Sequence, residues 1–234
     1  GVLARAGHTE AGSDYARLAG SLPAAVIADI LTSDGLLADG PTLGEFASKH
    51  KLKIGTIADL IHFRLANERT IRRVREGPIQ TTYGEFRLTA YRDQTIGGIH
   101  LALSLGDIVA DQPTLVRVHV QSALRDLLAS EIPDRPTWSI GKCLQAVMDN
   151  GHGVVVLLAQ EEGAERLLAS IDMVQGAEMI AGMAGPDAYT SVGLGSQILK
   201  DLGVGKIHLM GAPIQYNAIS GFDLEVLEFV DPAH

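Results

Sequence analysis

Two hydrophobic patterns divide this sequence, and they meet at a charged segment that spans residues 68–77. Before the segment, apolar residues recur at the three- and four-residue spacing of helices, as in residues 56–67. From residue 84 onward, apolar and polar residues alternate over residues 86–91 and 99–104, which is typical of half-buried strands. The sequence therefore predicts an α/β (α+β) chain built from two pieces.

The charged segment has more than one interpretation. It carries four arginines between residues 69 and 75 and ends at Gly77 and Pro78. It can be a linker, a strand that leads into the second piece, or a solvated extension of the preceding helix. The division that we adopt is a first domain at 1–67, a linker at 68–77 and a second domain at 78–234.

We expect three helices and one strand in the first piece. Thr9 is placed as the N-cap of a helix that stops at Gly20. Residues 24–31 form an apolar run that only Asp29 interrupts, which predicts a buried strand. The other two helices are predicted from capping-box patterns, which begin at residues 42 and 56.

The second piece mixes strands with helices. A helix with one apolar face is predicted at residues 139–151, and another, closed by Gly203, at 194–202. Strands are predicted at residues 86–91, 99–104, 115–120, 153–159, 207–210 and 224–230.

Composition narrows the classes of function. Of the 234 residues, 46% are hydrophobic and 20% charged, which fits a folded globular protein. The formal net charge of −9 repels a phosphate backbone, so we expect no nucleic-acid partner. No apolar run reaches the roughly 20 residues that span a bilayer, and no signal peptide is visible. We therefore expect no membrane partner and a cytoplasmic location. Because the sequence lacks an initiator methionine, we also expect it to begin inside a domain.

The first candidate site is the run Arg-Ala-Gly-His-Thr-Glu-Ala at residues 5–11. A loop that feeds a helix N-terminus presents free N–H groups and the positive end of the helix dipole to an anion. Arg5 adds a planar charge that suits phosphate, Thr9 adds a hydroxyl, and His8 can bind a metal ion. A capped helix with an exposed arginine and histidine explains the same residues without any ligand.

Residues 1–67 resemble the C-terminal part of 3,4-dihydroxy-2-butanone 4-phosphate synthase. The resemblance rests on residues 5–11 together with Ala-Arg-Leu-Ala-Gly at 16–20, Glu-Phe-Ala at 45–47 and Ile-Gly-Thr-Ile-Ala-Asp-Leu-Ile at 54–61. The family acts in riboflavin biosynthesis and converts ribulose 5-phosphate to the four-carbon phosphate and formate, with Mg²⁺ (or Mn²⁺) as its cofactor.

The resemblance also implies roles for individual residues. His8 is then a metal ligand, and Arg5 and Thr9 contact the substrate phosphate. Asp29 stands where the family usually has a glutamate, so its catalytic carboxylate is shorter by one methylene. The family's remaining site residues lie before the matching part, so we expect the chain by itself to be inactive and the intact protein to bind ribulose 5-phosphate.

Residues 78–234 resemble GTP cyclohydrolase II. The matching runs are Leu-Val-Arg-Val-His at 115–119, Gly-His-Gly-Val-Val at 151–155 and Gly-Ser-Gln-Ile-Leu at 195–199. The family's three zinc-binding cysteines correspond to Ser122 and, by spacing, to Pro133 and Arg135, so we expect no zinc. Cys143 lies on the apolar face of a predicted helix, where we expect it to pack in the core.

Other parts of the cyclohydrolase site also depart from the family pattern. The family's guanine- and phosphate-binding runs correspond to residues 160–165 and 210–215, and its catalytic run to 187–191. None of these three segments keeps the arginine or lysine of the family, and both residue types bind phosphate. We therefore expect the second domain to lack zinc and GTP chemistry.

Two functions remain open for the intact protein. The first is a dihydroxybutanone phosphate synthase with a non-catalytic cyclohydrolase-like module. The alternative is a non-catalytic scaffold or regulatory protein of the riboflavin pathway, with Asp29 marking a lost activity. The resemblance implies a homodimer in either case. The lone histidines His119, His152 and His208 are interpreted as structural.

Overall fold

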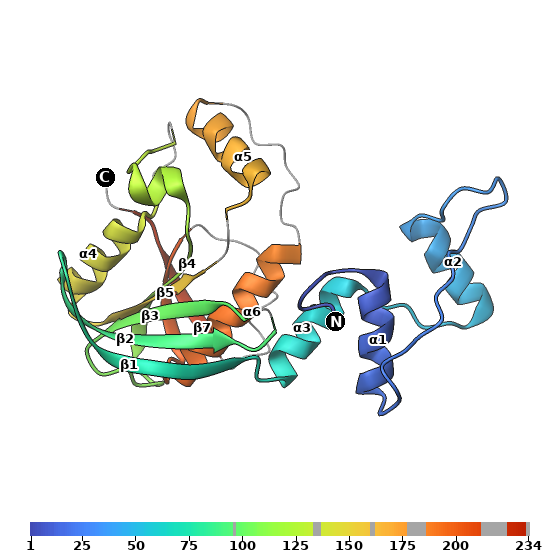
Figure 1. The fold of residues 1–234 in the computed structure, drawn as a ribbon, viewed down its shortest axis with the longest axis horizontal. Helices are drawn as coiled ribbons and strands as arrows, with labels where there is room; N and C mark the ends of the chain where they lie inside the picture. Colours follow the sequence, from blue (N-terminus) through green and yellow to red (C-terminus); the bar gives the residue numbers. More distant parts are fainter. Residues whose placement is uncertain (96, 133–136, 160–161, 177–185, 212–223, 233–234) are drawn as a thin grey trace. The chain divides into compact units, whose positions relative to one another are not determined.

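The structure, a computed structural model, describes residues 1–95, 97–132, 137–159, 162–176, 186–211 and 224–232. The chain divides into two compact units, Gly1–Arg64 and Leu65–His234. The first unit is helical, and the second is built around one large sheet (Figure 1). Within the described residues, no helix is long and apolar enough to cross a membrane.

Three helices begin in the first unit, and their caps follow from short polar residues. Asp39 caps α2 by accepting a hydrogen bond from the Thr42 N–H at 3.0 Å, so the capping box predicted to begin at Thr42 is wrong and the helix starts at Gly40. Thr56 accepts from the Asp59 N–H at 3.0 Å, which confirms it as the predicted N-cap, and its hydroxyl donates to the Asp59 carboxylate at 2.8 Å. The helices are α1 His8–Leu18, α2 Gly40–His50 and α3 Ile57–Asn67.

The predicted cap of α1 is wrong. The helix begins at His8, and its N-cap is Gly7, whose side chain can accept nothing. Thr9 is therefore the second helical residue, because the extended backbone turns into the helix two residues earlier than Thr9 would require. The predicted stop at Gly20 agrees with the structure, since Gly20 has φ +77° just after the helix.

A buried carboxylate holds the first unit together. Asp14 on α1 accepts the Val2 N–H at 2.7 Å and lies 2.9 Å from Nη1 of Arg64 on α3. The side chains of Asp14 and Arg64 are both almost fully buried. Because each charge would be costly to bury alone, the pair stabilises the packing of the N-terminal loop and of α3 around α1.

The strand predicted at residues 24–31 is not present. The segment is extended but forms no ladder, and only a single bridge joins Leu31 to Leu37. Val26 is fully exposed, and Asp29 is exposed as well. A strand needs a neighbouring backbone to pair with, and residues 1–64, all of which are described, contain no other strand. The apolar run alone could not reveal this.

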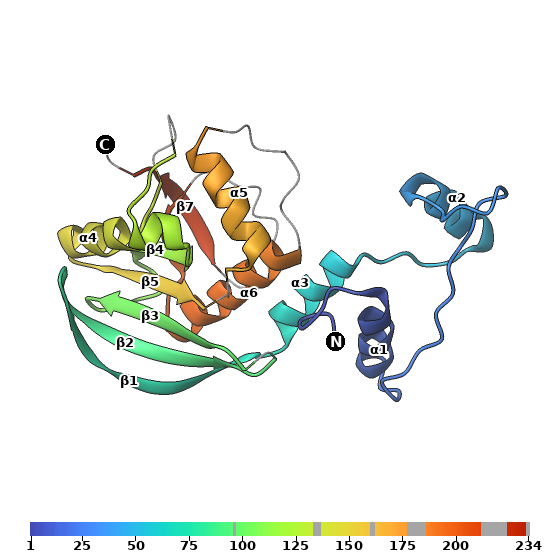
Figure 2. The same cartoon turned by 45° about the horizontal axis from the view of Figure 1, so that its top comes forward.

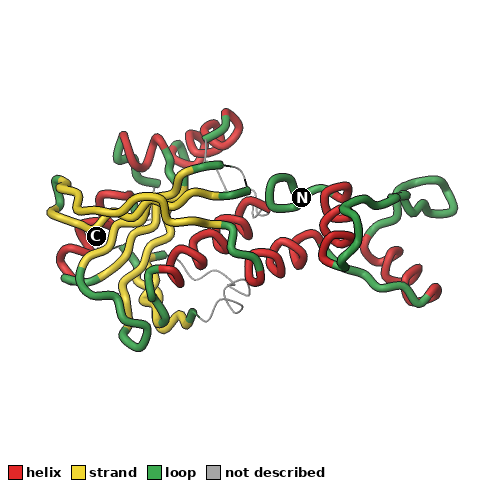
Figure 3. The backbone as a smooth tube through the Cα atoms, turned by 60° about the horizontal axis from the view of Figure 1, so that its bottom comes forward, coloured by secondary structure: helices red, strands yellow, loops and turns green. Residues whose placement is uncertain are grey.

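The second unit contains a seven-stranded mixed sheet with the order β1-β2-β3-β5-β4-β6-β7. Its first four strands in that order pair antiparallel, and β5, β4, β6 and β7 pair parallel. Figures 2 and 3 show the strands as one twisted layer. The strands are β1 Ile71–Thr81, β2 Gly84–Asp93, β3 Ile99–Leu105, β4 Pro113–Val120, β5 Gly153–Leu158, β6 Lys206–Met210 and β7 Glu225–Val230.

Apolar side chains on both faces of the sheet make two cores. Val155 on β5 packs with Cys143 and Val147 of α4, on one face. Val154 and Val156 point to the other face and pack with α6. The helices of the second unit are α4 Ile140–Asn150, α5 Ala164–Val174 and α6 Pro186–Asp201, and a short π-helical turn, η1, spans Ala123–Leu127.

Part of the predicted linker is a strand. Residues 71–77 belong to β1, which pairs with β2 along its whole length. Pro78 is tolerated there because β1 is an edge strand, where a missing N–H breaks no ladder. Gln197 of α6 fixes the approach to β1, accepting from the Thr70 N–H at 2.9 Å and donating to the Leu65 carbonyl at 2.7 Å.

The other predicted elements of the second unit are present, and apart from the start of α6 their ends shift by at most two residues. Ser139 caps α4 and Gly151 ends it in the left-handed conformation, at the two ends of the helix predicted at residues 139–151. Three features of the described second unit were missed: η1, α5, and the first two turns of α6 before residue 194. The α/β (α+β) fold class is confirmed.

The close approach of β5 to β4 gives a test of the fold. A methyl group at Gly153 would lie 2.7 Å from the backbone oxygen of Leu115 and 2.9 Å from Cγ2 of Val147. Because a backbone oxygen in the sheet cannot move away cheaply, we expect Gly153→Ala to destabilise the second unit by about 1–3 kcal/mol. Urea unfolding followed by the fluorescence of Trp138, the only tryptophan and a member of the α4 core, measures this.

The matched control is Gly77→Ala on β1. A methyl group there meets no atom within 4 Å, and the backbone has no positive φ. We expect the free energy of unfolding of that variant to lie within about 0.5 kcal/mol of the wild-type value. Equal losses in the two variants would contradict this account of the β4–β5 contact.

Candidate functional site

The motif at residues 5–11 folds as predicted into a loop followed by the N-terminus of α1. His8 and Thr9 occupy its first two positions and are exposed. Arg5 forms an ion pair with Glu10, with Nη1 of Arg5 3.3 Å from Oε1, and its side chain remains 81% exposed. Such an exposed pair is weak, so a phosphate group could compete with Glu10 for Arg5.

Asp29, the fourth predicted site residue, is also exposed, and it has no hydrogen bond or ion pair within residues 1–64. The segment before it lies along α1: Ser13 donates to the Pro23 carbonyl at 2.6 Å, and a methyl group on Gly12 would lie 2.9 Å from Cβ of Ala25. The structure therefore places the chain leading to Asp29 beside the helix that carries His8, without joining the two side chains.

The residues present supply only part of a metal site. His8 offers one exposed imidazole at the start of α1. Within the described ranges, no three histidine, cysteine, aspartate or glutamate side chains are grouped so that they could hold an ion. Magnesium takes six oxygen-rich ligands, so His8 by itself cannot define such a site.

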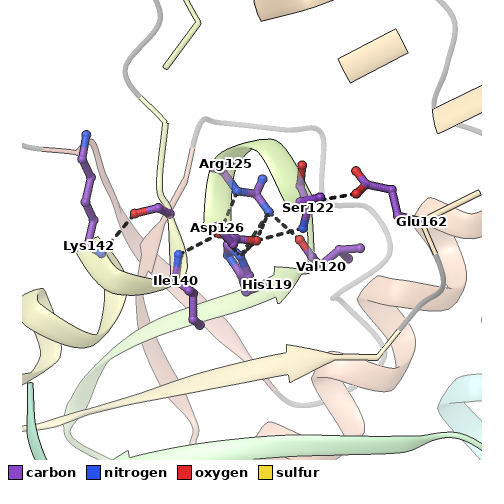
Figure 4. Close-up of polar contacts among 10 residues, drawn as sticks. His119, Val120, Ser122, Arg125, Asp126, Ile140, Lys142 and Glu162 are labelled. Carbon is purple, nitrogen blue, oxygen red and sulfur yellow. Dashed lines mark hydrogen bonds and ion pairs between the residues drawn. The ribbon is translucent and has the colours of Figure 1, made fainter. Parts of the chain in front are cut away.

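The second unit holds a buried polar cluster at the carboxyl end of β4 (Figure 4). Asp126 on η1 lies at its centre, and its two oxygens are each 2.9 Å from Nε2 of His119. The carboxylate also accepts the N–H groups of Ser122 at 2.8 Å and Ile140 at 2.9 Å. One side chain therefore joins the end of β4, the turn that follows it and the start of α4.

Charge and burial fix the protonation of this cluster. Burial lowers the pKa of His119 below its ordinary value, and the charges of Arg125 and Arg117 add to this effect against the attraction of Asp126. Burial would raise the pKa of Asp126, but hydrogen bonds from His119, Arg125 and two backbone N–H groups outweigh it and hold that pKa far below its usual range. The pair is a neutral imidazole facing a carboxylate.

The carboxylate also sets the tautomer of His119. We assign the His119 proton to Nε2, where it can donate to Asp126, because the two carboxylate oxygens at 2.9 Å outweigh the one Arg125 nitrogen that lies 3.1 Å from Nε2 and can only donate. The Nδ1 atom is then a bare acceptor, and it is buried with no hydrogen-bond partner. An unpaired acceptor costs less than an unpaired N–H would, which favours the same assignment.

Two further charged residues close the cluster. Arg125 donates to Oδ2 of Asp126 at 3.2 Å and to the Val120 carbonyl. Glu162, which follows β5, accepts the N–H of Ala123 at 2.8 Å, while its other oxygen is buried without a partner. The cluster therefore spans the carboxyl ends of two neighbouring parallel strands, where open α/β sheets usually bind ligands.

This cluster occupies the region where the resemblance places the zinc site of GTP cyclohydrolase II. Ser122, at the first cysteine position, uses its N–H to bind Asp126. Pro133, Arg135, residues 160–161 and residues 212–215 lie outside the described residues, and so do the side chains of 186–189. Cys143 is fully buried in the α4 core, and burial raises the pKa of its thiol to about 12.

Sequence reasoning missed the centre of this cluster. His119 was interpreted as structural, and neither Asp126 nor Glu162 was singled out. Adjacent Arg125 and Asp126 in an otherwise apolar run were the available signal. Nothing in the sequence showed that the turn after β4 brings Asp126 back onto His119.

Comparisons with known proteins agree with both resemblances. The family described as GTP cyclohydrolase II matches residues 72–231, and the family described as 3,4-dihydroxy-2-butanone 4-phosphate synthase matches residues 1–63. The chain belongs to the GTP cyclohydrolase II family through its second unit, and its first 63 residues carry a segment of the synthase family. Both resemblances found in the sequence are thereby confirmed.

Individual relatives combine the same two parts. A 3,4-dihydroxy-2-butanone 4-phosphate synthase of Pseudomonas aeruginosa is 50% identical over 98% of this chain and 62% of its own length. The riboflavin biosynthesis protein RibBA of Aquifex aeolicus is 41% identical over 98% of this chain and 59% of its own length. The chain thus spans about three fifths of the length of these curated relatives.

A solved structure is similar over nearly the whole chain. The crystal structure of RibBX, a two-domain 3,4-dihydroxy-2-butanone 4-phosphate synthase from A. baumannii, is similar with a TM-score of 0.78 and 42% identity. The match covers 98% of this chain and 61% of that one.

The neutral state of His119 predicts a pH dependence. The pKa of His119 is lower in the folded chain than in the unfolded chain, where it has its ordinary value of about 6.5. Below that pH, His119 is therefore protonated to a greater extent in the unfolded chain. Stability should therefore fall as the pH drops from 7 to 5, by up to about 1.4 kcal/mol per pH unit. His119→Gln, which keeps a donor for Asp126, should flatten this slope in urea unfolding followed by Trp138. The contribution of Asp126, whose pKa is lowered, should persist until the pH falls below about 4.

His152→Gln provides the control. His152 is partly exposed and bonds to the Asp107 carbonyl at 2.8 Å, outside the cluster. It should keep the slope of the wild type. A His119→Gln variant with an unchanged slope would show that His119 is not the group that titrates.

The buried thiol gives a further prediction. Because the pKa of Cys143 is raised to about 12 and the side chain is fully buried, the folded protein should not react with a thiol reagent such as 5,5′-dithiobis(2-nitrobenzoate). In denaturant, one thiol per chain of 234 residues should react promptly. Rapid labelling of the folded chain would contradict a purely packing role.

Proposed function

We propose that the full-length protein is a 3,4-dihydroxy-2-butanone 4-phosphate synthase of riboflavin biosynthesis, with a second unit that has no cyclohydrolase activity. The observation that carries the proposal is the motif at residues 5–11, which keeps Arg5, His8 and Thr9 exposed at the start of α1. Relatives up to 50% identical bear the synthase name over the same residues.

In this proposal each motif residue has a distinct role. Arg5 and Thr9 bind the phosphate of ribulose 5-phosphate, with help from the positive end of α1. His8 is one ligand of a divalent cation, Mg²⁺ or Mn²⁺, and its other ligands come from parts of the protein outside this chain. The cation, when bound, polarises the keto group of the sugar. Asp29 acts as the catalytic carboxylate.

Asp29 has to be brought to the substrate by neighbours that this chain lacks. Its segment is extended, exposed and apolar at Val26 and Ile27, which fits a strand that pairs and becomes buried in the complete domain. A misplacement of about 1 Å at a catalytic group can cost about 100-fold in rate. The shorter carboxylate therefore works only if that pairing holds the backbone closer to the substrate. This chain alone is inactive on this account.

The second unit is proposed to lack zinc and GTP chemistry. The support is the cluster around Asp126, which lies where the family has its zinc site. The cluster is held by hydrogen bonds to a carboxylate and contains no thiolate. Zinc needs deprotonated ligands that face a common point, and Cys143 packs instead among Val147 and Leu144. The whole protein is further proposed to be cytoplasmic and homodimeric, with no nucleic-acid or membrane partner.

Formate release from ribulose 5-phosphate with Mg²⁺ tests the proposal. The full-length wild-type protein should be active. His8→Gln should lower kcat/KM by at least about 100-fold, since even outer-shell partners of metal ligands contribute 10- to 100-fold. His50→Gln, an exposed histidine on α2 of the same unit, should keep the wild-type rate.

Each outcome decides one part of the proposal. A folded full-length protein without formate release would exclude the synthase and favour the alternative, a non-catalytic scaffold or regulator of the pathway. Activity that survives His8→Gln would exclude His8 as a metal ligand. Formate release from GTP would show that the second unit still performs cyclohydrolase chemistry.

A further inference from the structure

The arginines of β1 and β2 divide between the two faces of the sheet. On the face that packs against α6, Arg73 pairs with Asp201 at 2.9 Å and lies 5.8 Å from the centre of the Tyr91 ring. Arg87 pairs with Glu76 at 3.0 Å on the same face. These arginines are therefore neutralised within the chain.

The opposite face carries three arginines that have no acidic partner among the described residues. Arg72 lies directly across the ladder from Arg92, and the bulge between Arg73 and Arg75 brings Arg75 opposite Ala90. Because paired residues share a face, Arg72, Arg75 and Arg92 all point to the α4 side of the sheet. All three are exposed, and the described part of the chain provides no carboxylate for any of them.

Such an arrangement has an energetic cost. Like charges directly opposite each other in a ladder destabilise it. The formal net charge of −9 makes the absence of acidic neighbours more notable, because carboxylates are abundant in this chain. Charged side chains on an edge strand also prevent aggregation. That role does not require Arg72 to lie opposite Arg92, nor all three arginines to lie on one face.

The spacing of these residues suits one small anion. Directly opposed residues have Cβ atoms about 5 Å apart, and diagonal neighbours such as Arg75 and Arg92 are about 7–8 Å apart. Three long guanidinium side chains can therefore converge on a single phosphate group. Ala90, which lies between Arg75 and Leu101 in the ladder, leaves room above the sheet. Planar guanidinium groups bind phosphate oxygens in pairs, which a lysine cannot do.

We propose that the α4 face of β1 and β2 binds a small phosphorylated molecule between Arg72, Arg75 and Arg92. This arginine face is formed by β1 and β2, whereas the cluster around Asp126 lies at the end of β4 and the motif at residues 5–11 belongs to the other unit, so it is a further ligand site on the protein. The proposal does not depend on the synthase activity. A site of this kind on a non-catalytic unit suits a regulatory ligand.

Calorimetric titration of the full-length protein with inorganic pyrophosphate at fixed ionic strength tests the proposal. Wild type should bind saturably, and the double variant Arg72→Gln/Arg92→Gln should bind at least 10-fold more weakly. Arg87→Gln is the matched control, because Arg87 is an exposed arginine of β2 on the other face and should leave the affinity unchanged. Because Arg5 is itself proposed to bind phosphate, all of these titrations are made in the Arg5→Gln background, which separates this binding from the motif at residues 5–11.

Thermal unfolding followed by Trp138 guards against a folding artefact. The double variant should be at least as stable as the wild type without ligand, because it removes the opposed pair. Pyrophosphate should raise the melting temperature of the wild type and not that of the double variant. Absence of saturable binding, or equal weakening by Arg87→Gln, would overturn the proposal. A change of oligomeric state in the double variant, measured by light scattering, would overturn it in favour of a protein interface.

Discussion

The parallel pairing of β4 with β5 is the constraint on which the second unit depends. The two strands lie side by side at the middle of the sheet, and Gly153 lets their backbones approach closely. Val154, Val155 and Val156 then point alternately to α6 and α4, so both cores form around one strand. The same register places His119 opposite Leu157, at the edge where parallel strands end. The polar cluster is a consequence of this register.

Around Asp126, the proposed loss of zinc leaves hydrogen bonds to hold the turn after β4. In a zinc site, thiolates would hold the turn after β4 through the metal. Here Asp126 holds the same turn by accepting hydrogen bonds from His119, Ser122 and the first residue of α4. A buried carboxylate with this many donors is well stabilised, although a buried pair is costly if either partner is removed. The cluster thus explains how the loop can keep a defined shape without a metal ion.

Much of the second unit could be predicted from the sequence, because its elements are set by local patterns. Each of these patterns is contained within a few neighbouring residues. Examples are the alternation in β2 and β3 and the apolar face of α4. The arginine-rich start of β1 was ambiguous because its partner strand, not its own pattern, decides its structure. The N-cap of α3 at Thr56 was predictable. The N-cap of α1 was predicted at Thr9 but is Gly7, because the helix already begins at His8.

The candidate site was predictable only in part. The motif at residues 5–11 could be recognised because its chemistry lies in one short run. Asp126 could not, because its role arises from a turn that returns it to His119. The segment around Asp29 was predicted as a strand from its apolar residues, but strand formation depends on a neighbour that residues 1–64 do not provide. Pairing between distant residues is the information that a single sequence lacks.

The zinc content of the purified full-length protein tests the central claim, that hydrogen bonds to Asp126 stand in place of a metal site in the second unit. Elemental analysis by mass spectrometry after dialysis, with a zinc-bound GTP cyclohydrolase II as the positive control, gives the ratio of zinc to protein. The account predicts no more than trace zinc, with the cluster intact. A stable ratio of one zinc per chain would contradict it and would require ligands other than the Ser122 and Cys143 side chains.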